Sequence, residues 1–152
     1  MTQIIDSNKF GKVTIEDIVR FEKANNILLP EDYKAFLLKH NGGRPFPNME
    51  PTAKSNVQWI LGMVEEPSFA SLFQQHDMFC KRIPSWYFPI ANDSGGNLYL
   101  MSLFAENYGL IAFWRHEQET TGDADQYFEN MSIVANSFSE FLDQLVANVE
   151  TT

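Results

Sequence analysis

The chain has 152 residues, 44% hydrophobic and 20% charged, which fits one soluble globular domain of residues 1–152 with its core over about 14–148. Its one cysteine, Cys80, excludes an intrachain disulfide framework and a cysteine-rich zinc site. The net charge of −9 disfavours contact with nucleic acid or anionic membranes. Neither a signal peptide nor a membrane-spanning apolar run is visible, so we expect a cytoplasmic protein.

Two helices are predicted in the N-terminal third of the chain. The first follows Thr14, which stands in a capping-box position with Asp17. Its expected apolar face consists of Ile15, Ile18, Val19 and Phe21. The second helix begins near Pro30 and should end at Gly42 and Gly43. The residues that fall at helical spacing on one face are Tyr33, Phe36, Leu37 and His40.

The middle of the chain alternates between strand and helix patterns. Residues 56–64 alternate as a strand that would place Val57, Trp59, Leu61 and Met63 on one face. A third helix is expected after Pro67, followed by extended segments near residues 86–91, 97–104 and 110–116. The terminal helix starts with a capping box at Ser137 and Glu140. Its stripe would be Phe138, Phe141, Leu142, Leu145, Val146 and Val149.

This order of elements predicts an α+β fold. Consecutive strands joined by short turns favour a central antiparallel or mixed sheet. We expect the N-terminal helices and the C-terminal helix to pack together on one face of that sheet.

The stretch "PIANDSGGNLYL" has the composition of a catalytic or phosphate-binding loop. A P-loop needs a lysine after its last glycine, and no lysine occurs after Lys81. A dinucleotide loop needs spaced glycines, and a calcium loop needs a closing acid; both are missing. The interpretation is a structural turn, in which Asp93 caps backbone amides while Gly95 and Gly96 supply positive φ angles.

We expect no catalytic residue, cofactor or metal. The three histidines share no metal-ligand spacing. A triad of Cys80, His116 and Asn92 can be written down, but nothing in the sequence brings these residues together. A small hydrolase that uses Cys80 or Asp93 stays as an alternative function.

The negative charge is concentrated in the last quarter of the chain. After Arg115 there is no Lys or Arg. The acids beyond it are Glu117, Glu119, Asp123, Asp125, Glu129, Glu140, Asp143 and Glu150. Such a segment either serves only as a solvated surface or attracts a cationic partner.

Four stretches in order resemble the signatures of the SUKH superfamily: "FEKANNILLPEDYKAFLLKHNGGRP", "PIANDSGGNLYL", "GLIAFWRHE" and "VANSFSEFLDQL". The resemblance extends from about residue 14 to 146. It implies an α+β immunity protein, without transferable catalytic residues, that binds and neutralises a cognate toxin. The implied target is the C-terminal nuclease domain, an RNase, of an LXG-class toxin. The family also contains eukaryotic regulators of cell-wall synthesis, so a regulatory protein-interaction module is the second alternative.

The charge pattern and the resemblance together give a binding hypothesis. A nuclease binds a polyanion and therefore has a basic cleft, which an acidic surface can occupy. The expected toxin contacts are Glu117, Glu119, Asp123, Asp125 and Glu129. The expected aromatic anchors are Trp114, Tyr127 and Phe128. The alternative contact surface is the loop of residues 44–53, and the oligomeric state stays open.

Overall fold

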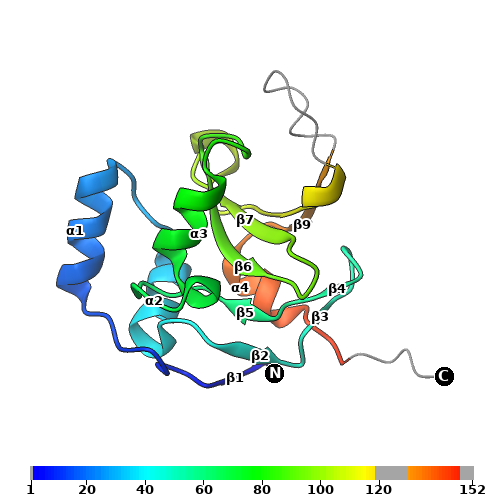
Figure 1. Ribbon diagram of the computed structural model, residues 1–152, viewed down its shortest axis with the longest axis horizontal. Coiled ribbons are helices and arrows are strands. Elements are labelled where there is room, and N and C mark those ends of the chain that lie inside the picture. The colour runs from blue at the N-terminus through cyan, green and yellow to red at the C-terminus, as the bar shows by residue number, and fades with distance from the viewer. Residues whose placement is uncertain (1, 119–129, 148–152) are drawn as a thin grey trace.

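The computed structural model describes residues 2–118 and 130–147. Over these residues, helices pack on a central antiparallel sheet, which confirms the α+β prediction (Figure 1). The helices are α1 (Ile15–Asn25), α2 (Glu31–His40), α3 (Leu72–Phe79) and α4 (Phe138–Asp143). Single 3-10 turns are η1 (Ser68–Ala70), η2 (Ala105–Asn107) and η3 (His116–Gln118).

The central sheet is a five-stranded meander in the order β5-β6-β7-β8-β9. Its strands are β5 (Trp59–Ile60), β6 (Tyr87–Asn92), β7 (Leu98–Ser102), β8 (Ile111–Trp114) and β9 (Met131–Ala135). Each strand pairs antiparallel with the next. Two short antiparallel pairs lie beside it: β1 (Gln3–Ile5) with β2 (Arg44–Phe46), and β3 (Met49–Glu50) with β4 (Ser55–Asn56).

Alternation along the central strands divides the core between the two faces of the sheet. On β7, Tyr99 and Met101 belong to the main cluster, while Leu98 and Leu100 belong to a second cluster with Trp114. The main cluster also contains residues of α1, α2 and α4. These three helices therefore cover the same face, as expected from the sequence.

Aromatic rings join α2 to α4 over that face. The Phe138 ring centroid lies 5.0 Å from those of both Tyr33 and Phe36. The backbone amide and hydroxyl of Ser139 both donate to the carboxylate of Asp32. Helices α2 and α4 are thus held together by edge-to-face aromatic contacts and by the Asp32 carboxylate.

The capping box of α1 forms in full, whereas that of α4 forms only in part. The Ser137 hydroxyl accepts from the Glu140 amide, but the Glu140 carboxylate accepts from the Asn136 amide and not from that of Ser137.

The end of α2 also differs from the prediction. The residue that stops α2 is Asn41, with φ of 41°, and Gly42 and Gly43 follow it. The buried Asn41 side chain donates to the Gly11 carbonyl and accepts from the Met63 amide. Asparagine adopts the left-handed conformation at low cost, and here its amide also connects two loops.

Three predicted elements were wrong in extent. Helix α3 begins at Leu72, because residues 68–70 form a 3-10 turn. Helix α4 ends at Asp143, after which Val146 forms an antiparallel bridge with Met49; Val149 lies outside the described residues. The strand predicted over 56–64 reduces to β5.

The alternation predicted around β5 also fails. Trp59 packs in a separate cluster with Phe10, whereas the neighbouring Ile60 joins the main core with Leu61. The chain leaves the sheet at Gly62, which pairs with Ser71 instead. Tertiary packing here overrides the period-two pattern.

Candidate functional site

The loop of residues 92–97 is a turn organised by one carboxylate. Oδ1 of Asp93 accepts from the backbone amides of Gly95 and Asn97, at 2.9 and 2.8 Å. Oδ2 accepts from the Ser55 hydroxyl at 2.7 Å and from the Asn97 side chain at 2.9 Å. Asp93 therefore caps backbone amides, as predicted.

These contacts also set the ionisation of Asp93. Burial by itself would raise the pKa of the carboxyl, but the hydrogen bonds from Ser55, Asn97 and Gly95 outweigh it and lower the pKa below its ordinary value. Both oxygens are engaged as acceptors. The carboxylate is thus arranged to hold a turn together rather than to take a proton from a substrate.

The two glycines of the turn are not equivalent. Gly96 has φ of +90°, and a Cβ there would lie 3.1 Å from Nε2 of His116. Gly95 lacks a positive φ, and a Cβ there would meet only ordinary contacts. The prediction that both glycines supply positive φ is correct for Gly96 and wrong for Gly95.

Cys80, His116 and Asn92, the residues of the hypothetical catalytic triad, each contact other groups and not one another. The His116 ring bonds the Gly95 carbonyl at 2.9 Å, and the Asn92 amide donates to the Phe69 carbonyl. The Cys80 thiol lies 3.8 Å from the Asp77 carbonyl one turn earlier. Over residues 2–118 and 130–147, no group of three or more His, Cys, Asp or Glu is placed to hold a metal ion.

The acidic segment is only partly within the described residues. Glu117 is exposed in η3. Trp114 is completely buried. The centroid of its ring lies 5.6 Å from that of Phe79 and 5.3 Å from the Arg82 guanidinium. The prediction that Trp114 is a surface anchor was therefore wrong. The other predicted contacts lie outside the described residues: Glu119, Asp123, Asp125, Tyr127, Phe128 and Glu129.

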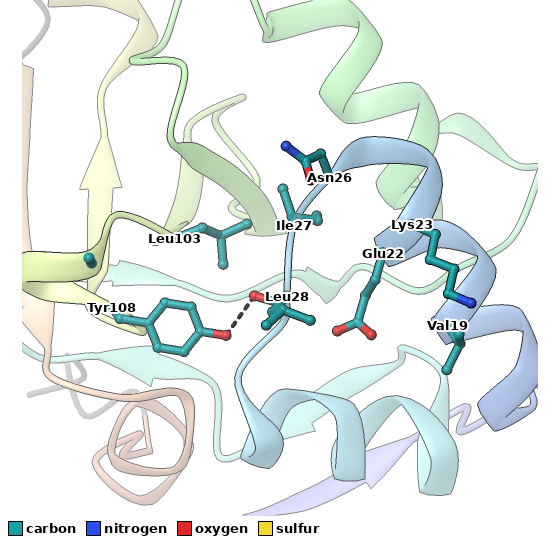
Figure 2. Close-up of a pocket in the computed structure, with 9 residues that line it drawn as sticks. Val19, Glu22, Lys23, Asn26, Ile27, Leu28, Leu103 and Tyr108 are labelled. Carbon is teal, nitrogen blue, oxygen red and sulfur yellow. Dashed lines mark hydrogen bonds between the residues drawn. The ribbon is translucent and has the colours of Figure 1, made fainter.

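A groove of about 1010 Å³ lies between α1, the segment that leads to α2, and the loop after β7 (Figure 2). Its walls are mainly apolar. It is lined by Val19, Glu22, Lys23, Asn26, Ile27, Leu28, Leu103, Ala105 and Tyr108. Leu28, on its rim, is 69% exposed.

Hydrogen bonds hold the walls of the groove. The Tyr108 hydroxyl donates to the Leu28 carbonyl at 2.6 Å. Oε2 of Glu22, a residue only 7% exposed, accepts from the Leu29 amide at 2.8 Å and lies 3.6 Å from Nζ of Lys34. Figure 2 shows the Glu22 side chain extending into the space between Leu28 and Val19.

Sequence reasoning did not single out this groove, although two signals were present. The run Ile27-Leu28-Leu29 places three bulky apolar residues in succession where the chain connects two helices, and only Leu29 is fully buried. The apolar face expected on α1 is wider than the part that packs, since Ile15 and Val19 are 47% and 39% exposed. Exposed apolar residues that lie together on one surface mark a candidate binding groove.

Residues 12–144 match the model of the SMI1/KNR4 family, SUKH-1. The chain belongs to this family. It is also 28% identical over 163 aligned positions to the SPbeta prophage-derived uncharacterized protein YokK of Bacillus subtilis (strain 168), covering 93% of this chain and 80% of that protein. Membership of SUKH-1 supports an immunity-like or SMI1/KNR4-type role, in which the protein acts by binding another protein. Among the helices described here, none has the length and apolar character to cross a membrane.

Proposed function

We propose that this SUKH-1 protein is an immunity protein that binds a cognate polymorphic toxin in the cytoplasm and neutralises it by stoichiometric binding, without catalysis. The observation that carries the proposal is the family match over residues 12–144 combined with an acidic segment that has no Lys or Arg after Arg115. The proposed target is the nuclease domain of the toxin, an RNase of the LXG class.

Charge supports this choice of target. A nuclease active site is basic because it binds a polyanion. Glu117, Glu119, Asp123, Asp125 and Glu129 would attract such a cleft over a long range and speed the encounter. In this proposal Tyr127 and Phe128 supply the aromatic contacts, and Trp114 has no part in them.

A regulatory interaction module remains the second candidate, favoured by the same family match. The two functions differ in whether the protein protects cells against a toxin. Co-expression with candidate toxin nuclease domains should restore growth and yield a co-purifying complex if the protein is an immunity protein. A regulator of a cellular partner would give neither result.

The acidic segment is tested by reversing Glu117, Glu119, Asp123 and Asp125 to lysine. We expect this variant to associate at least tenfold more slowly with the nuclease that the wild-type protein inhibits. The association rate of the wild-type protein should fall as salt is added. The matched control reverses four exposed acids elsewhere, Glu16, Glu65, Glu66 and Asp77. Equal losses in the two variants, or wild-type association indifferent to salt, would contradict the proposed contact.

A further inference from the structure

We propose that the groove between α1 and residues 103–108 is a docking site for a segment of a partner protein that presents a Lys or Arg beside bulky apolar side chains. The identity of that partner as the toxin rests on the proposed function. The chemistry of the segment follows from the groove itself.

The apolar part of the groove is exposed but held in place. Leu28 is 69% exposed and Tyr108 is 45% exposed, while Leu29, next to Leu28, is buried in the core. The 2.6 Å hydrogen bond from Tyr108 to the Leu28 carbonyl fixes the backbone that carries this leucine. A preorganised apolar surface loses little conformational entropy when a partner binds it.

The charged part of the groove comes from Glu22. Its Oε2 is used by the Leu29 amide and the Lys34 ammonium, and its Oε1 accepts no hydrogen bond from the described residues. Lys34 is shared, because its Nζ lies 2.8 Å from Glu31. A nearly buried carboxylate with one free oxygen in an apolar groove favours a cationic donor on the occupant.

The charged residues around the groove also favour a positively charged occupant. Burial raises the pKa of Tyr108; Lys34 opposes this, and the negative charges of Glu22, Glu31 and Asp32 add to it. Glu106 lies in η2, between the groove residues Ala105 and Tyr108. The nearby cations are Lys23 and the shared Lys34. Acids therefore outnumber bases, which complements a basic segment and repels an acidic one. A volume of about 1010 Å³ accommodates several side chains, so the occupant is a segment and not a single residue.

The test needs no toxin. A short synthetic peptide of leucine and lysine is titrated into the isotope-labelled protein, beside two peptides in which glutamine or glutamate replaces every lysine. Amide chemical shifts show where each peptide binds. We expect the lysine peptide to shift the amides of residues 19–28 and 103–108, with weaker binding of the glutamine peptide and none of the glutamate peptide.

Two variants and a control locate the contact. Leu28→Asp places a charge on the exposed rim, and Glu22→Gln removes the buried charge while keeping an oxygen for the Leu29 amide. Each should weaken binding of the lysine peptide about tenfold or more. The control is Phe46→Asp on β2, where an apolar side chain 61% exposed lies outside the groove lining.

Shifts that appear elsewhere, or binding that falls with Phe46→Asp and not with Leu28→Asp, would overturn the proposal. Equal binding of the lysine and glutamate peptides would also overturn it. Rescue of growth from a toxin is measured in a separate experiment. If the lysine peptide binds the groove but the protein restores no growth, the result counts against the proposed function alone.

Discussion

The hydroxyl of Tyr108 donates a 2.6 Å hydrogen bond to the backbone carbonyl of Leu28, joining residues 80 positions apart. This bond connects the loop after β7 to the segment between α1 and α2 (Figure 2). It holds the backbone that carries the exposed Leu28 side chain. The shape of the groove therefore depends on a contact between two segments far apart in the sequence.

Replacing Tyr108 by phenylalanine should loosen this segment. The ring stays but its donor is lost, so we expect the free energy of unfolding to fall by about 0.5–1.5 kcal/mol. Amide hydrogen exchange at residues 26–29 should become faster, while exchange in the central sheet stays unchanged. Unchanged exchange at these amides would show that the bond does not hold the segment.

Replacing Asp93 by asparagine should destabilise the turn of residues 92–97. The variant loses the charge that four hydrogen bonds stabilise, and its amide group would face the donors of Ser55 and Asn97. We expect a loss of roughly 1–3 kcal/mol at neutral pH, measured by chemical denaturation.

The pH dependence of this loss has a defined sign. The pKa of Asp93 is lowered in the folded state, so its contribution is complete above the ordinary carboxyl value of 3.8 and disappears as the pH falls through the lowered pKa. The stability difference between wild type and Asp93→Asn should narrow under acidic conditions. A difference that stays constant with pH would contradict a role for the ionised carboxylate.

Gly95 and Gly96 form a matched pair for substitution by alanine. Gly96→Ala forces a side chain to a φ of +90° and against His116, so we expect a loss of about 1 kcal/mol or more. Gly95→Ala should change stability little, since its Cβ meets no close neighbour. Melting temperatures of the two variants provide the comparison, and an equal loss in both would show that the turn is strained at Gly95 as well.

His76 should reduce stability in mild acid. Its ring stacks on Phe88 with centroids 4.1 Å apart, and burial lowers its pKa although Asp77 partly opposes this. The unfolded chain therefore takes up a proton first, and stability falls as the pH drops from the ordinary histidine value of 6.5 toward the lowered pKa. His76→Phe should show a smaller fall over that interval. An identical pH profile would contradict a role for His76, and His40, whose pKa is also lowered by burial, would be the next histidine to replace.

Local patterns were sufficient to predict the fold class and the N-cap residues of α1 and α4. Thr14 and Ser137 are recognisable because a helix start depends on residues three positions apart. The end of α4 was not predictable in this way. Val146 continues the helical stripe in the sequence, but its backbone pairs with Met49, nearly a hundred residues earlier. Such a long-range partner has no signal in the local pattern.

The candidate site shows the same division. Asp93 could be assigned to a turn because its partners Gly95 and Asn97 are neighbours in the chain. Trp114 was misassigned because the alternation of β8 does not tell which side is covered; here Phe79 and Arg82 cover it. The groove requires Leu28 and Tyr108 to meet, a contact that only the folded chain reveals.

The central claim is neutralisation of a toxin nuclease by stoichiometric binding, and a titration tests it most directly. The purified protein is added in increasing amounts to a fixed concentration of the nuclease domain against which it protects cells. Both concentrations lie well above the dissociation constant of the complex, and the remaining nuclease activity is measured. We predict a linear fall that reaches complete inhibition at a fixed molar ratio, with the nuclease recovered intact from the complex. Complete inhibition by an amount of protein far below that of the nuclease, or recovery of a chemically altered nuclease, would show that the protein acts as an enzyme. Either result would contradict the account.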